Sequence, residues 1–162
     1  MPVRRIRAKN RESIDAAIKD IGQMKLRVGW FASAKYETGT PVAMVAAAHE
    51  FGVPQNGLPP RPFMRPTIAE NRDRWLKYFA QQVRHIFEGE STVEIALNQV
   101  GLNMAGKIKQ AISKVTQPPL KTATVKAKMR KRKTAKTPGN LTKPLVDTGL
   151  MISTVTHEVS RE

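Results

Sequence analysis

The chain has 162 residues, of which 40% are apolar, and it carries a formal net charge of +15 with no cysteine. The absence of cysteine excludes disulfides, cysteine-zinc centres and thiol catalysis, and no apolar run approaches the roughly 18 residues that a bilayer crossing needs. The basic residues 1–7 have no apolar core behind them, so they are not typical of a secretory leader. We expect a single domain over residues 1–162, made in a reducing cytoplasm.

The first third of the chain predicts a helix, a strand and a second helix. Apolar residues recur at helical spacing over 11–21, and apolar and polar residues alternate over 25–31. Thr40 and the proline after it are expected to start a helix over 42–51, which Gly52 ends. Because this helix is rich in Ala and Val, it is expected to pack closely against a sheet of its own domain or against a neighbouring subunit.

Residues 53–66 contain five prolines. Proline fixes φ and lacks a backbone donor, so this segment is expected to be an extended, partly exposed arm and neither helix nor central strand. Phe63 and Met64 can anchor such an arm, and Arg61 and Arg65 can bind carboxylates. Two interpretations stay open: the arm straps the domain's own core, or it docks across a subunit boundary.

Two long helices separated by Gly89 are predicted after the arm. One stripe of the first consists of Ile68, Arg72, Trp75, Phe79, Val83 and Ile86. The second is expected to be capped by Thr92, and its stripe consists of Val93, Leu97, Val100, Met104, Ile108, Ala111 and Val115. Together the elements predict the α+β class: a small antiparallel or mixed sheet packed by two long helices, with the proline-rich arm and a long basic loop.

Positive charge is concentrated between Ile95 and Val146, where twelve Lys or Arg residues occur without one Asp or Glu. We expect a flexible basic loop over 117–144, within which 122–133 can form a helix that lacks an apolar stripe and is marginal by itself. A terminal strand over 152–159 is expected to follow.

The basic loop is the candidate contact with DNA or with an acidic partner. Its candidate residues are Lys126, Lys128, Arg130, Lys131, Arg132, Lys133 and Lys136. No Phe, Tyr or Trp follows Phe87, so contacts from this loop are expected to reach phosphates rather than stacked bases.

One motif, Asp147-Thr148-Gly149 after two apolar residues, matches the surroundings of the catalytic aspartate in aspartic proteases, which need a second such carboxylate. The mostly helical chain favours a turn instead, with Asp147 accepting from nearby backbone N–H groups and Gly149 at positive φ. His49 has no second histidine four residues later, and the three histidines are widely spread. We therefore expect no enzyme, no cofactor and no metal site.

Three blocks carry a resemblance: residues 42–52, residues 58–66 and residues 144–149, followed by Ser153. Their Glu-Phe-Gly, Arg-Pro-Phe and Asp-Thr-Gly sequences, in this order, resemble the tail-completion or neck proteins of tailed bacteriophages, also called minor tail or virion-morphogenesis proteins. The blocks cover about a fifth of the chain, and the basic segment lies outside them.

The resemblance implies a structural virion protein of the head–tail junction, which forms a homo-oligomeric ring around the DNA channel, a hexamer or dodecamer, and joins tail to head. Implied partners are neighbouring neck, tail-terminator or tail-tube proteins and the DNA backbone, with no membrane; the implied location is the virion, and the host cytoplasm during assembly. The expected interface residues are Glu50, Phe51, Arg61, Pro62, Phe63, Met64 and Arg65. The alternative, from the charge alone, is a general nucleic-acid-binding protein without sequence specificity.

Overall fold

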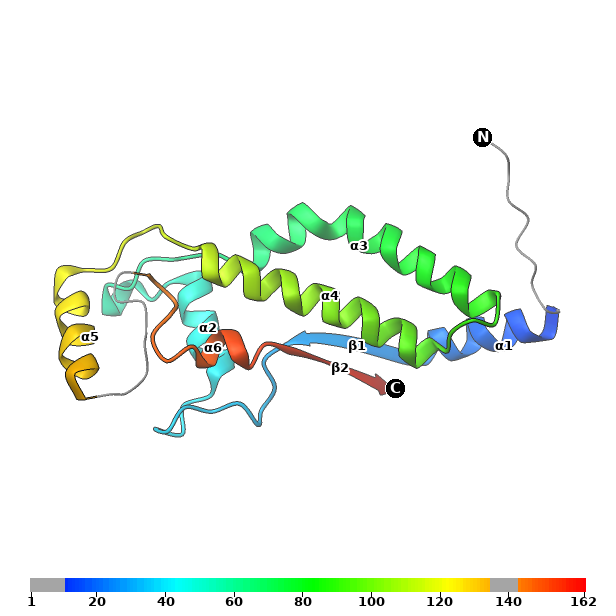
Figure 1. The fold of residues 1–162 in the computed structure, drawn as a ribbon, viewed down its shortest axis with the longest axis horizontal. Coiled ribbons are helices and arrows are strands. Elements are labelled where there is room, and N and C mark those ends of the chain that lie inside the picture. The colour runs from blue at the N-terminus through cyan, green and yellow to red at the C-terminus, as the bar shows by residue number, and fades with distance from the viewer. Residues whose placement is uncertain (1–10, 135–142) are drawn as a thin grey trace. The chain divides into compact units, whose positions relative to one another are not determined.

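The computed structural model describes residues 11–134 and 143–162, and its internal contacts group them into two compact units. Unit 1 comprises residues 11–28, 70–105 and 156–162. Unit 2 comprises residues 29–69, 106–134 and 143–155. The class is mixed α+β, as predicted, with a two-stranded antiparallel sheet packed against helices (Figure 1).

The sheet of unit 1 pairs β1 (Met24–Gly29) with β2 (Thr156–Arg161), and α1 (Arg11–Gly22) precedes β1. The amide of Glu162 donates to the carbonyl of Gln23 at 2.9 Å, which fixes the antiparallel register. Arg27 on β1 and Glu158 on β2 form a cross-strand ion pair at 3.2 Å. The helix over 11–21 is thus confirmed, whereas the first strand ends two residues before its predicted end.

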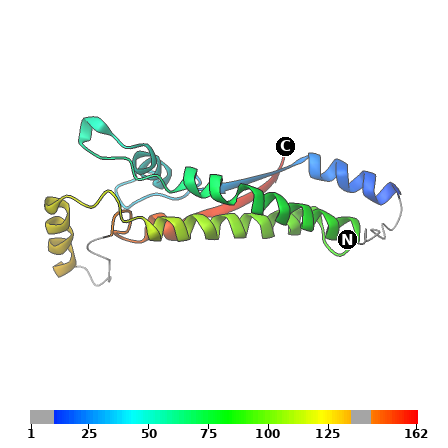
Figure 2. The ribbon, with the colours of Figure 1, turned by 90° about the horizontal axis from the view of Figure 1, so that it is seen from above.

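Helices α3 (Met64–Phe87) and α4 (Val93–Lys114) each contribute to both units, and their parts in unit 1, residues 70–87 and 93–105, run side by side in opposite directions (Figures 1 and 2). The turn between them contains Gly89 at φ +76°, and the hydroxyl of Thr92 accepts from the amide of Ile95 at 3.2 Å, so both predicted features are present.

The buried face of α3 differs from the predicted stripe. Trp75 is buried as predicted, but Ile68 is 44% exposed, and the polar Asn71 and Gln82 are buried. The indole Nε1 of Trp75 donates to Oδ1 of Asn103 on α4 at 3.2 Å. The spacing of apolar residues could not predict this buried face, because the face includes the amide side chains of Asn71 and Gln82.

Helix α4 lies directly against β2 at Gly101, inside unit 1. A Cβ at Gly101 would lie 2.5 Å from Cδ2 of His157. Nε2 of His157 is 2.9 Å from Oδ1 of Asn98, one turn earlier on α4. The missing side chain therefore lets the helix approach the strand closely.

In unit 2, α2 (Val42–Phe51) has the predicted bounds, but Pro41 occupies the N-cap position and makes no side-chain cap hydrogen bond, so the cap predicted at Thr40 is wrong. The arm over 53–66 contains a short 3-10 helix, η1 (Pro54–Asn56), and its last three residues form the first turn of α3. The prediction of a helix-free arm is thus wrong, because proline is compatible with the first helical turn, where the amide has no partner within the helix.

The core of unit 2 gathers around Phe63, which is 2% exposed. Its ring meets that of Trp30 edge to face, with centroids 5.9 Å apart, and Nε1 of Trp30 donates to the carbonyl of Met151 at 2.8 Å. Trp30 was expected on the strand, but β1 ends before it, so its side chain serves unit 2. Other buried apolar residues of this unit include Val42, Ala46, Ile108, Ile112, Pro144, Met151 and Val155.

Two segments near the C-terminus are helical where a loop and a strand were predicted. The expected loop over 117–144 contains α5 (Thr122–Thr134), a basic helix of the kind foreseen within it. The expected strand over 152–159 starts later, because Leu150–Ser153 forms α6. The hydroxyls of Ser153 and Thr154 donate to the carbonyl of Leu150 at 3.1 and 2.6 Å, which favours the helical turn over an extended chain.

Candidate interaction surfaces

The carboxylate of Glu50, near the end of α2, is the N-terminal cap of α3. Its Oε2 accepts from the amides of Phe63 and Met64 at 2.7 and 2.9 Å, and its Oε1 accepts from the amide of Arg65 at 3.1 Å. The first amides of a helix have no partner within it and carry a partial positive charge, so an anion there is stabilised. The residue is only 4% exposed.

The charge of Glu50 is compensated in place. Nε of Arg65 lies 3.0 Å from Oε1. Burial alone raises the pKa of Glu50, but the three amides and Arg65 outweigh burial, and the net pKa is lowered. Glu50 is therefore held as a carboxylate that joins α2 to the start of α3.

Arg61 ties the middle of the arm to the segment after α4. Its Nε donates to the carbonyl of Pro118 at 2.8 Å and its Nη2 to that of Pro119 at 3.1 Å, and the residue is 3% exposed. Gly52 permits the return of the arm past α2, since its φ is +77° and a Cβ there would lie 2.8 Å from the nitrogen of Pro60. The arm is thus a strap of its own unit.

These contacts place three of the predicted interface residues inside unit 2. Glu50, Arg61 and Phe63 are buried within unit 2 and contact its own backbone and core, so they do not form an outer surface. Met64 is half-buried, whereas Pro62 is exposed. The Glu-Phe-Gly and Arg-Pro-Phe blocks are brought together, but mainly by hydrogen bonds inside the chain.

The outer face of α2, by contrast, is exposed. Met44 is 65% exposed and Phe51 64%, and Ala47 between them is also exposed. Their spacing places all three on one side of the helix, opposite the buried Val42, Ala46 and Glu50. The guanidinium carbon of Arg65 lies 4.9 Å from the ring centroid of Phe51. We call Met44, Ala47 and Phe51 the α2 face.

Lys128, one of the residues predicted to contact DNA or an acidic partner, is bonded within its own unit. Its Nζ donates to the carbonyls of Val146 and Lys143 at 2.8 and 3.2 Å, and its side chain is 12% exposed. Burial lowers its pKa, and Asp147, with Oδ1 3.9 Å away, acts in the opposite direction. Lys128 therefore fixes α5 to the chain before α6 and is not free to contact a partner.

Lys126 and Arg130 are exposed on α5, as a contact surface requires. The side chains of Lys131, Arg132 and Lys133, and the whole of Lys136, lie outside the described residues.

A cavity of about 740 Å³ lies within unit 2. Its lining includes Tyr36, His49, Thr124, Lys128, Asp147 and Met151. Burial raises the pKa of Tyr36, and the charge of Asp147 adds to that shift. Burial also lowers the pKa of His49, and the positive charges of Arg61 and Lys128 lower it further.

Two minor alternatives from the sequence concern residues of this cavity: an aspartic-protease motif at Asp147 and a site at His49. The described residue paired with Asp147 is the ammonium of Lys128, whereas aspartic proteolysis needs a second carboxylate sharing a proton. In the turn, the hydroxyl of Thr148 accepts from the amide of Leu150 at 3.2 Å, and Gly149 has the expected positive φ of +77°. Nδ1 of His49 is buried, and no described group partners it.

One potential metal-binding group occurs in the described ranges, and sequence reasoning missed it. His85, Glu88 and Glu90 lie at the turn between α3 and α4 with their ligand atoms within 4.8 Å of one another. The signal was present as the spacing His-x-x-Glu-x-Glu across the helix end.

Comparison of the chain with protein-family models, with curated proteins and with solved structures found no match. Over the residues described, none of the helices combines the length and apolarity needed to cross a bilayer.

Proposed function

We propose that this chain is a structural protein of a tailed-phage virion, placed at the neck or tail end, where copies form a closed ring around the DNA channel. The proposal rests on the three sequence blocks and on the way two of them fold together. Glu50 and Arg61 hold the arm and α2 as one body by buried hydrogen bonds. The opposite, apolar side of α2 remains exposed.

The α2 face supports the proposal most directly. Two large apolar side chains, Met44 and Phe51, stand more than 60% exposed on a helix that carries no Lys, Arg or Asp. Contiguous exposed apolar surface of this kind is typical of protein–protein contacts. A ring forms when one surface meets a different surface of the next copy and the rotation closes. We infer that the α2 face, with the exposed Pro62 of the strap, contributes one side of that contact.

An interface variant tests the proposal. We expect the purified chain to form six- or twelve-membered rings by sedimentation, and Phe51→Asp to shift it towards monomers, because a charge would then be desolvated in the contact. Leu76→Asp is the matched control, since Leu76 is 57% exposed on α3, outside the α2 face. Monomers of the parent chain under all conditions, including mixtures with neighbouring virion proteins, would refute the ring.

The alternative function, general nucleic-acid binding, is supported by the exposed Lys126 and Arg130 on an acid-free helix. Such binding would weaken linearly on a log–log plot against salt, with about 0.9 units of slope for each neutralised phosphate. We expect Lys126→Ser with Arg130→Ser to reduce the slope for duplex DNA by about 2, equally for unrelated sequences. Tight binding by monomers would favour this function over the ring, and an unchanged slope would exclude α5 from the contact.

A further inference from the structure

The turn between α3 and α4 has a backbone fixed by two hydrogen bonds. The amide of Glu90 donates to the carbonyl of His85 at 2.9 Å, and the amide of Gly89 donates to that of Ile86 at 3.0 Å. With Gly89 at φ +76°, this is the Schellman arrangement that commonly ends a helix. Residues 85–90 are thus held in one defined conformation.

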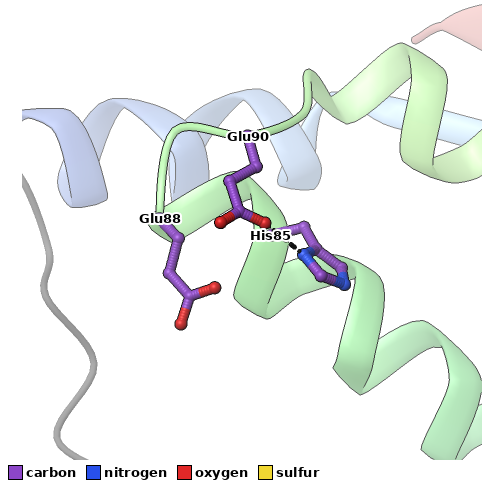
Figure 3. A group of neighbouring side chains, drawn as sticks. All are labelled: His85, Glu88 and Glu90. Carbon is purple, nitrogen blue, oxygen red and sulfur yellow. Dashed lines mark hydrogen bonds and ion pairs between the residues drawn. The ribbon is translucent and has the colours of Figure 1, made fainter.

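This backbone places one imidazole and two carboxylates together (Figure 3). Nδ1 of His85 lies 2.7 Å from Oε2 of Glu90, and Glu88 extends from the same turn beside them. One ligand atom from each residue lies within 4.8 Å of the other two. His85 and Glu88 are half-buried, whereas Glu90 is exposed, so an ion can reach the group from solvent.

The charge pattern around the turn favours a cation. No Lys or Arg occurs between Arg84 and Lys107, while Glu88, Glu90 and Glu94 do, in a chain whose net charge is +15. The end of α3 adds the partial negative charge of its terminal carbonyls. The turn therefore combines local negative charge with a nitrogen ligand.

We propose that His85, Glu88 and Glu90 bind one divalent transition-metal ion, with Zn²⁺ as the best-fitting ion. The imidazole nitrogen favours such ions over Mg²⁺ and Ca²⁺, which take oxygen ligands. Zinc binds nitrogen and oxygen at about 2.0–2.2 Å, so ligand atoms around a tetrahedral ion lie about 3.4 Å apart. To hold the ion, the His85–Glu90 pair would have to open from 2.7 Å, and separations in the group that exceed about 3.4 Å, all of them within 4.8 Å, would have to close.

The ion would replace the hydrogen bond between His85 and Glu90, with the imidazole proton then carried on Nε2. Three protein ligands leave the fourth position of a tetrahedral zinc ion to water. The bound ion links the last turn of α3 to the residues before α4, so it stabilises the helical hairpin of unit 1. This role is independent of the ring.

Titration with ZnCl₂ of the full-length, tag-free, chelator-treated chain tests the proposal. We expect one ion per chain by calorimetry and an affinity at least about tenfold lower in His85→Asn and in Glu90→Gln. Glu94→Gln is the matched control, because Glu94 lies in the same base-free stretch but outside the group, and its affinity should match the parent's.

Visible spectra of the Co²⁺-loaded chain supply a second readout, since four-coordinate cobalt absorbs much more strongly than cobalt in water. Circular dichroism of each variant checks that it is folded before titration. Strong absorption that is lost in Glu88→Gln and Glu90→Gln supports the site. No saturable binding at millimolar Zn²⁺, or an equal loss in Glu94→Gln, would overturn it.

Discussion

Units 1 and 2 are held together by different kinds of contact. In unit 1, α4 follows a regular apolar pattern and packs on β2 through a glycine. In unit 2, irregular backbone around the arm is held by two buried charged residues, Glu50 and Arg61. The first kind of order is periodic and local in the sequence, whereas the second joins residues that are 13–58 positions apart. Single substitutions should therefore lower stability for different reasons: through close packing in unit 1 and through lost buried hydrogen bonds in unit 2.

Glu50→Ala should have the largest effect on stability. It leaves three amides of α3 without their shared acceptor, and losing a charged cap together with the partner of buried amides costs about 2–4 kcal/mol. Urea unfolding measures the loss. Glu70→Ala, on the exposed side of α3, is the control and should change the free energy of unfolding by less than about 0.5 kcal/mol. Equal losses in both would mean that Glu50 is not the cap.

Gly101→Ala tests the close packing of α4 on β2 in unit 1. The added Cβ would lie 2.5 Å from the ring of His157, so overpacking should lower stability by about 1–3 kcal/mol despite alanine's better helix propensity.

The matched control is Gly106→Ala on the same helix, where nothing lies within 4 Å of the new Cβ. It should raise stability by about 0.5–1 kcal/mol. Thermal unfolding of both variants measures the contrast, and stabilisation by both would contradict the close packing of α4 on β2.

Lys128→Met should lower stability by about 1–2 kcal/mol, because the carbonyls of Val146 and Lys143 lose their donor while the methylene packing is retained. Lys126→Met, two residues away and exposed, should be close to neutral. Chemical unfolding of the pair checks this. Similar small effects in both variants would show that α5 is a passive basic helix.

The smallest expected effect is a dependence of stability on pH between 7 and 5. The pKa of His49 is lowered from 6.5, so the folded chain prefers the neutral imidazole. Its contribution is complete above the ordinary pKa and declines as the pH falls below it, because the unfolded chain takes up the proton first. Unfolding free energies of the parent and of His49→Gln, measured across this range, should show a flatter slope for the variant. Parallel slopes would show that His49 does not cause the pH dependence of stability.

The sequence alone was sufficient to predict those helices, turns and caps that follow a periodic or local pattern. The helix predicted at 11–21 and the extent of α2 follow from spacing, and the turn at Gly89 and the cap at Thr92 follow from capping preferences. The α+β class follows from the same elements.

The remainder depends on contacts between residues far apart in the chain. Glu50 and Lys128 resemble surface residues by type, and only their bonds to distant backbone groups identify them as internal. The buried face of α3 was misassigned because Asn71 and Gln82 occupy core positions. Periodicity contains no information about such partners, so the candidate surfaces could be named from sequence but not divided into inner and outer residues.

We propose that copies of this chain assemble through the α2 face into a closed ring. Cryo-electron microscopy of the purified protein, at concentrations where sedimentation detects assembly, tests it most directly. We expect closed rings of six or twelve copies, with Met44 and Phe51 covered by the next copy. A structure of the assembled protein in which the α2 face remains open to solvent, or isolated monomers at every concentration with and without neighbouring virion proteins, would contradict it.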